Sequence, residues 1–159
     1  NEFDNIIVVH SFTKFYAVPG LRIGAAFSDP LIIEQINSFI PTWSVNTLAQ
    51  AYTEAALNDV EYVKRTKQEL REEQGFVYSS LDAIASITVY PPSANFILFH
   101  IDQEGITAES INEALKKHNM IIRNCDSYMG LNNQWVRVAI KDHDTNVRLV
   151  EKLTDILKV

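Results

Sequence analysis

The chain has 159 residues, of which 47% are hydrophobic and 21% charged, and its formal net charge is −6. This composition is that of a folded globular protein and excludes intrinsic disorder. The net negative charge argues against nucleic-acid binding, because the chain has no broad positively charged surface to contact phosphates. The single cysteine, Cys125, excludes a disulfide scaffold and a cysteine zinc site and fits a reducing cytoplasm, where we expect the protein. No apolar run is long enough to cross a bilayer and the histidines lack ligand spacing, so we expect neither a membrane partner nor a metal site.

The first part of the chain is predicted to be the end of an α/β layer. Residues 5–10 are apolar on both faces, which is typical of a buried central strand in a parallel sheet. Such a strand needs neighbours that nothing upstream of it supplies, so we expect the chain to be part of a larger protein. A second strand is predicted over 22–27. Helices are predicted over 30–39, capped by Asp29, and over 45–57, whose small uncharged residues indicate a packed interior helix.

The rest of the chain is predicted to hold a long exposed helix and a small α+β unit. Charged residues with a narrow apolar stripe indicate one helix over 59–83, which we expect to bridge two packed units. The elements after it have the order ββαββα, which favours an antiparallel sheet with helices on one face. They are predicted over 87–90, 94–101, 108–118 (capped by Thr107), 120–124, 134–140 and 145–157. The predicted divisions of the chain are therefore 1–58, 59–83 and 84–159.

The residues with the most distinctive chemistry follow the first predicted strand. Ser11, Thr13, Lys14 and Arg22 lie beyond its carboxyl end, where ligands bind in open α/β sheets. Two hydroxyl donors and a guanidinium fork suit a phosphate group, and an amine beside them suits Schiff-base formation. Taken one at a time, Lys14 could equally be a surface lysine in a turn and Arg22 the partner of a carboxylate.

The same segment resembles the lysine signature of the class I/II aminotransferases, the fold-type-I enzymes that use pyridoxal 5′-phosphate. The matching residues are Ser11, Thr13, Lys14, Gly20, Leu21, Arg22 and Gly24. The resemblance implies that Lys14 holds the cofactor as a Schiff base, and that Ser11 and Arg22 bind its phosphate with Thr13 nearby. It also implies an α/β fold of which this chain is the C-terminal part: the end of the large cofactor domain, followed by a small α+β domain with an antiparallel sheet.

Further motifs are similar to the family branch that contains histidinol-phosphate aminotransferases and threonine-phosphate decarboxylases. They are the segments 91–99, 122–131 and 136–140. The resemblance implies that Arg137 grips a substrate carboxylate, that Arg123 lies close to the anionic end of the substrate, and that Asn95 takes part in substrate binding. An arginine fork matches a carboxylate bidentately. The alternatives are that both arginines only make surface ion pairs and that Asn95 satisfies backbone groups at a strand edge.

The residues after Arg123 are more similar to threonine-phosphate decarboxylase, which implies release of carbon dioxide from a small phosphorylated amino acid to give aminopropanol phosphate for cobalamin synthesis. A histidinol-phosphate or related aminotransferase is the alternative enzyme, and a non-catalytic isolated domain is the alternative of another class. The family also implies a homodimeric parent protein. Its remaining cofactor contacts precede the lysine strand, so we expect the isolated 159-residue chain to bind cofactor weakly and to turn over little.

Overall fold

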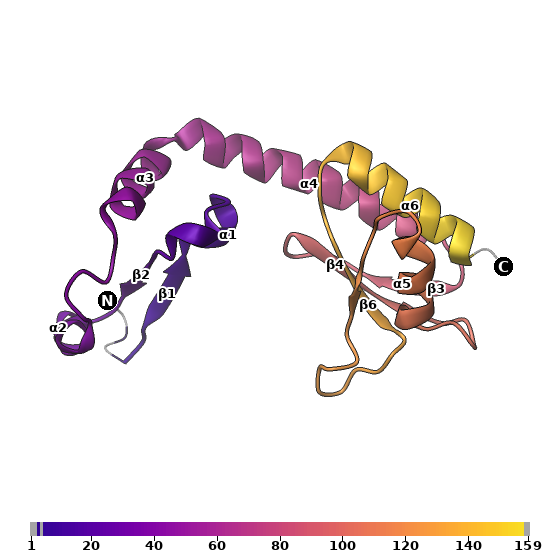
Figure 1. Cartoon of the computed structure of the whole chain (residues 1–159), viewed down its shortest axis with the longest axis horizontal. Helices are drawn as coiled ribbons and strands as arrows, with labels where there is room; N and C mark the ends of the chain where they lie inside the picture. Colours follow the sequence, from indigo (N-terminus) through magenta and orange to yellow (C-terminus); the bar gives the residue numbers. More distant parts are fainter. Residues whose placement is uncertain (1–2, 4, 158–159) are drawn as a thin grey trace. The chain divides into compact units, whose positions relative to one another are not determined.

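The computed structural model describes residue 3 and residues 5–157, and divides the chain into two compact units, Asn1–Val63 and Lys64–Val159 (Figure 1). In chain order the elements are β1 (Val8–Ser11), α1 (Phe12–Phe15), the short 3-10 helix η1 (Pro19–Leu21), β2 (Gly24–Phe27), α2 (Pro30–Phe39), α3 (Thr47–Asn58), α4 (Val60–Asp82), β3 (Ile87–Tyr90), β4 (Phe96–Ile101), α5 (Ala108–Lys116), β5 (Arg123–Asn124), β6 (Trp135–Ala139) and α6 (His143–Leu157). No helix in the described part of the chain is long and apolar enough to span a membrane.

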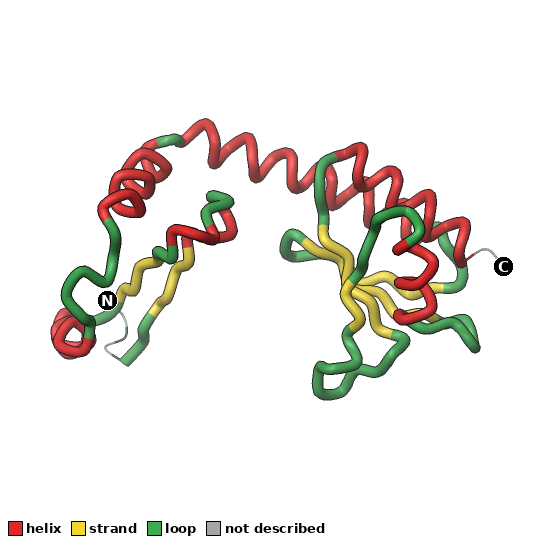
Figure 2. Tube along the Cα trace, in the orientation of Figure 1, coloured by secondary structure: helices red, strands yellow, loops and turns green. Residues whose placement is uncertain are grey.

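The sheet of the first unit is an antiparallel pair, β1 with β2 (Figure 2). The prediction of a buried central strand over 5–10 is wrong for the described residues, because β1 begins only at Val8 and all four of its residues are exposed. The reason is that an apolar strand is buried only where other layers cover its faces, and its single described partner is β2. The register places Ser11 opposite Gly24, so residues 12–23, which include α1 and η1, form the connection between the two strands.

Gly24 is required by the close approach of the two strands. A Cβ atom built on Gly24 would lie 2.7 Å from the backbone oxygen of His10, a distance that Cβ atoms do not tolerate. Gly20, by contrast, has no atom within 4 Å of such a Cβ. Of these two signature glycines, Gly24 therefore has a steric reason to be glycine in this structure.

The next two helices begin at side-chain caps. The Asp29 carboxylate accepts a hydrogen bond from the Leu31 N–H at 2.9 Å, which confirms the predicted cap of α2. The Asn46 side chain accepts one from the Ala49 N–H at 2.8 Å at the start of α3. The prediction that α3 is a packed interior helix is wrong here, because Ala49 is its one buried residue. Small apolar residues permit burial, but a covering layer has to be present for burial to occur.

The second unit is the predicted α+β unit, with an antiparallel sheet in the order β3-β4-β6-β5. Alternate residues of its strands are buried, so one face of the sheet shares a core with helices α4, α5 and α6. The fully buried residues of this core are Leu81, Ile97, Phe99, Ile101, Ala108, Ile111, Leu115, Val136 and Leu153. The opposite face carries half-buried and exposed side chains, among them Tyr90, Arg137 and Trp135.

The ends of these elements differ slightly from their predicted bounds. Thr107 caps α5 as predicted, in a capping box with Ser110. Asp142 caps α6, since its carboxylate accepts the Thr145 N–H at 3.0 Å, and the helix starts two residues earlier than expected. The strand predicted over 120–124 is confined to Arg123–Asn124. The division into 1–58, 59–83 and 84–159 stays a prediction.

Candidate functional site

Three of the predicted residues meet where β1 runs into α1. The Ser11 and Thr13 hydroxyl oxygens are 2.8 Å apart and hydrogen-bonded, and the Lys14 amine donates to the Thr13 hydroxyl at 3.4 Å. Thr13 is buried, whereas Ser11 and Lys14 are exposed. No carboxylate in the described part of the chain forms an ion pair with Lys14. The structure therefore presents an accessible amine next to two linked hydroxyl groups.

Arg22 lies at the turn between η1 and β2 rather than inside a strand, which corrects the predicted strand start at residue 22. Its φ angle is 51°, in the left-handed region that non-glycine residues seldom adopt. Its guanidinium donates to the Pro19 carbonyl at 2.9 Å and pairs with no described carboxylate. The next residue, Ile23, accepts the Phe12 N–H at 3.3 Å, so the Arg22 turn is tied to the first residue of α1.

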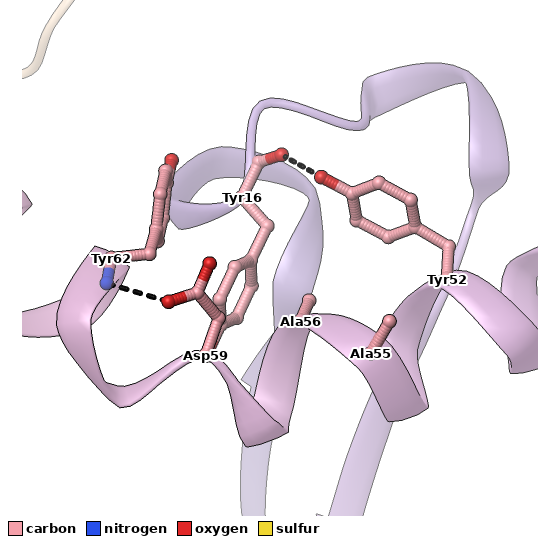
Figure 3. Close-up of a pocket in the computed structure, with 6 residues that line it drawn as sticks. All are labelled: Tyr16, Tyr52, Ala55, Ala56, Asp59 and Tyr62. Atoms are coloured by element: carbon pink, nitrogen blue, oxygen red, sulfur yellow. Dashed lines mark hydrogen bonds between the residues drawn. The ribbon is translucent and has the colours of Figure 1, made fainter.

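Two tyrosines that the sequence did not single out contact this lysine turn (Figure 3). The Tyr62 hydroxyl donates to the Phe15 carbonyl at 2.9 Å, and the Tyr52 hydroxyl to the Tyr16 carbonyl at 3.1 Å. They border a cavity of about 210 Å³ that Tyr16, Ala55, Ala56 and Asp59 also line. No local signal could have revealed these contacts, because the partners are 47 and 36 residues apart in sequence.

The remaining predicted residues gather in the second unit. Arg123 on β5 and Arg137 on β6 lie directly opposite each other in the antiparallel register. Both border a cavity of about 390 Å³ whose other lining residues include Asn95, Phe96 and Ala139. Asn95 is exposed, and its backbone carbonyl accepts the Ile140 N–H at 3.0 Å. The structure thus brings Asn95, Arg123 and Arg137 together within this unit.

Aromatic rings, not carboxylates, accompany the two guanidinium groups. Arg137 lies 4.8 Å over the ring of Phe96 and Arg123 lies 5.6 Å over that of Tyr128. Arg123 also donates to the Ser127 hydroxyl at 3.4 Å. Neither arginine forms an ion pair with a described carboxylate, so the surface ion-pair alternative is not what the structure shows. Two like charges placed directly opposite each other repel, and an anion between them would relieve that repulsion.

Cys125 is packed in the interior beside Arg123 and is not part of the exposed surface that Asn95, Arg123 and Arg137 form. The side chain is 1% exposed, and its sulfur lies 3.8 Å from the Arg123 carbonyl oxygen. Burial raises the pKa of the Cys125 thiol, while the charges of Arg137 and Arg123 act in the opposite direction. A buried thiol with a raised pKa is a poor nucleophile.

Comparison of the sequence with known protein families identifies the family of this chain. The aminotransferase class I and II family matches residues 1–153. The chain belongs to this family. Lys14, with Ser11, Thr13 and Arg22 around it, lies inside the matched residues, as do Asn95, Arg123 and Arg137. The fold class expected from the resemblance is confirmed.

Named relatives within the family carry two different activities. The chain is 37% identical over 154 residues to the threonine-phosphate decarboxylase of Salmonella typhimurium, covering 96% of this chain and 42% of the relative. It is 30% identical over 157 residues to the histidinol-phosphate aminotransferase of Methanosphaera stadtmanae, covering 99% of this chain and 43% of the relative. The chain therefore spans less than half the length of these curated relatives.

Two solved structures support the same fold. The histidinol-phosphate aminotransferase of Clostridium acetobutylicum superposes with a TM-score of 0.92 at 28% identity, covering 99% of this chain and 47% of the other. The L-threonine-O-3-phosphate decarboxylase of Porphyromonas gingivalis superposes with a TM-score of 0.84 at 23% identity, covering 98% and 48%. The second likeness concerns the fold alone.

Proposed function

We propose that the intact protein is a pyridoxal-phosphate-dependent enzyme that decarboxylates threonine phosphate to aminopropanol phosphate. The observation that carries the proposal is the accessible Lys14 amine beside the linked Ser11 and Thr13 hydroxyls, with no described carboxylate paired to it. These donors fit the cofactor, which offers an aldehyde to an amine and a phosphate to hydroxyl and guanidinium groups. The Arg22 guanidinium, which pairs with no described carboxylate, would supply the cation that a phosphate requires.

In this proposal, four residues of the first unit hold the cofactor. Ser11, Thr13 and Arg22 would bind its phosphate, and Lys14 would hold it covalently through Nζ. The left-handed backbone at Arg22 is a strained conformation of the kind that persists at binding sites. When bound, pyridoxal phosphate takes up the electron pair that stays on the α-carbon as carbon dioxide leaves. The Lys14 amine would then deliver a proton to the α-carbon, which replaces the lost carboxyl group.

The arginine pair of the second unit would recognise the substrate. Arg137 would bind the carboxylate with its planar fork, and Arg123 the phosphate group, with Asn95 as a further hydrogen-bonding partner. A dianionic phosphate and a carboxylate suit two guanidinium groups that no described carboxylate already neutralises. Two guanidinium groups therefore favour a substrate with both a carboxylate and a phosphate, such as a small phosphorylated amino acid. The identity to the Salmonella typhimurium decarboxylase supports the choice of threonine phosphate.

Amino transfer to a keto acid from histidinol phosphate is the second candidate. It is favoured by the close superposition on the Clostridium acetobutylicum enzyme. Both reactions would use the same Lys14 amine. They differ in which bond to the α-carbon breaks: the bond to the carboxyl carbon in the decarboxylase, and the bond to hydrogen in the transaminase.

The test uses the intact protein with added pyridoxal phosphate. We expect visible absorbance from the Lys14-bound cofactor, lost in Lys14→Ala and kept in the surface control Lys116→Ala. Absence of any lysine-dependent absorbance would contradict the enzyme proposal and favour a non-catalytic domain. Threonine phosphate is then offered with and without a keto acid. Carbon dioxide release without a keto acid supports the decarboxylase, whereas amino transfer without release establishes the aminotransferase.

The proposal includes a homodimer, as the family resemblance implies. Sedimentation equilibrium of the intact protein checks this, and a monomer at enzyme-assay concentration would contradict it.

A further inference from the structure

The turn that carries Lys14 cannot be stable by itself. Helix α1 has four residues, and its N-cap, Ser11, makes no side-chain capping bond. Isolated helices of this length do not persist in water, because nucleation fixes several residues for one hydrogen bond. The direction of the Lys14 amine therefore depends on contacts made by the rest of the fold.

Local hydrogen bonds satisfy only the first carbonyls of this turn. The Phe12 carbonyl accepts the Tyr16 N–H at 3.2 Å, the Thr13 carbonyl accepts the Val18 N–H at 3.1 Å, and the Lys14 carbonyl accepts the Ala17 N–H at 3.1 Å. The next two carbonyls, those of Phe15 and Tyr16, lie at the C-terminal end, where a helix has no partners of its own.

Two phenol groups occupy those two positions. Tyr62, in the first turn of α4, donates to the Phe15 carbonyl at 2.9 Å. Tyr52, on α3, donates to the Tyr16 carbonyl at 3.1 Å, and Figure 3 shows its hydroxyl pointing at that oxygen. Five consecutive carbonyls around Lys14 are thus satisfied, three by the turn itself and two by these tyrosines.

The rings add packing that is separable from the hydroxyl groups. Tyr62 stacks on Tyr16 with centroids 5.8 Å apart, and meets Phe15 edge-on at 5.9 Å. The Asp59 carboxylate accepts the Tyr62 N–H at 2.8 Å, which fixes the start of α4 beneath this ring. Replacing either tyrosine by phenylalanine removes the hydroxyl and keeps the ring, so the two contributions can be measured apart.

From these contacts we propose that Tyr52 and Tyr62 are positioning residues that set the direction of the Lys14 amine. The inference rests on the proposed function, since it assigns these tyrosines to the reaction of Lys14. A small misplacement of a reacting group lowers a rate strongly while leaving binding intact. Tyr52 and Tyr62 therefore affect the rate of the step that uses Lys14. They leave substrate binding by the arginine pair of the second unit unchanged.

The test compares Tyr52→Phe, Tyr62→Phe and the double variant with the intact wild-type protein, each with pyridoxal phosphate. We expect each single variant to lower kcat about 3- to 10-fold and the double variant further, with KM changed less than 2-fold. We also expect apoprotein to capture cofactor more slowly, seen as slower growth of visible absorbance. Tyr90→Phe is the control, because its ring lies in the second unit beside Trp135.

A readout independent of the cofactor is amide hydrogen exchange. Exchange at Tyr16, Ala17 and Val18, whose N–H groups bond the α1 carbonyls, should accelerate in both variants while the thermal midpoint stays within a few degrees. Unchanged exchange, capture rate and kcat would overturn the inference. So would faster exchange spread over the whole chain, which would mean a general structural role.

The two failures can be told apart. If the Lys14→Ala protein keeps the visible absorbance, the proposed function fails. If the Lys14→Ala substitution abolishes the visible absorbance but the tyrosine variants behave as wild type, only this inference fails.

Discussion

Arg137 lies over the ring of Phe96, with its guanidinium carbon 4.8 Å from the ring centroid. The aromatic face attracts the cation without neutralising it, so the planar fork of Arg137 stays available to an anion. A carboxylate in the place of Phe96 would hold the arginine more firmly but would compete with a substrate carboxylate. This relationship explains how Arg137 can lie in a sheet without an ion pair to any described carboxylate, as the proposed binding role requires.

We predict that Phe96→Leu weakens substrate binding by removing the stacking surface. An exposed cation–π contact contributes about 0.5–1 kcal/mol, so KM for the substrate should rise roughly 2- to 5-fold with little change in kcat. Steady-state kinetics of the intact protein measure this. Phe96→Tyr keeps an aromatic face and should restore the wild-type KM; equal KM values for Phe96→Leu and wild type would show that stacking does not position Arg137.

We predict that Gly24→Ala destabilises the β1–β2 pair. The new methyl group would lie 2.7 Å from the His10 carbonyl oxygen, so the strands would have to separate. Overpacking of this kind costs about 1–3 kcal/mol, and urea unfolding of the intact protein should show it. Gly20→Ala is the matched control, since nothing lies within 4 Å of its added atom, and comparable losses in both variants would contradict the steric explanation.

We predict that Asn146→Ala is among the most damaging single changes in the second unit. The Asn146 side chain is 1% exposed, donates to the Glu73 carboxylate at 2.8 Å and to the Lys141 carbonyl at 2.9 Å, and accepts the Lys141 N–H at 2.9 Å. Its removal takes away three hydrogen bonds to partly buried groups, and a hydrogen bond contributes about 0.5–1.5 kcal/mol net, or about 1.5–3 kcal/mol when one partner is charged, as Glu73 is. We therefore expect the free energy of unfolding to fall by about 3 kcal/mol.

The control for this prediction is Asn133→Ala, at an exposed loop position. It should change the free energy of unfolding by less than about 0.5 kcal/mol. A loss of similar size in both variants would show that asparagine content, not the buried network, determines the effect.

We predict a pH-dependent contribution from Asp102. Hydrogen bonds from Thr88, and then from His100, hold the pKa of this carboxyl below its usual value. A lowered folded-state pKa stabilises the fold above the unfolded-state pKa, about 3.9 for aspartate. This stabilisation is lost as pH falls through the folded-state pKa.

Thr88→Val should therefore raise the pKa of Asp102, because it removes the 2.7 Å hydrogen bond from the Thr88 hydroxyl. NMR titration of the side-chain carboxyl carbon measures the pKa directly. The stability difference between wild type and the variant should shrink as the pH is lowered below about 4. Thr88→Ser keeps the hydroxyl and should titrate as wild type; a Thr88→Val carboxyl that titrates as wild type would contradict the assignment.

Local signals in the sequence predicted most of the second unit. The strands predicted over 87–90 and 94–101, the Thr107 cap and the last helix depend on residues close together in the chain, so prediction and structure agree. The prediction for strand 120–124 extended too far, because the Asn112 side chain accepts the Ile122 N–H at 2.8 Å and donates to the Ile122 carbonyl at 3.0 Å, which takes these groups away from strand pairing. Burial of β1 and α3 was predicted wrongly, since burial depends on what covers an element and not on the element alone.

The sequence by itself determined the family and predicted the residues that carry the chemistry. The spacing of Ser11, Thr13, Lys14 and Arg22 is local, so it can be read without a structure. Only the tertiary structure showed that Arg123 faces Arg137 across two strands and that Tyr52 and Tyr62 hold the carbonyls beside Lys14. These contacts join residues far apart in the chain, and no local pattern encodes them, because strand pairing and helix packing decide which distant side chains meet.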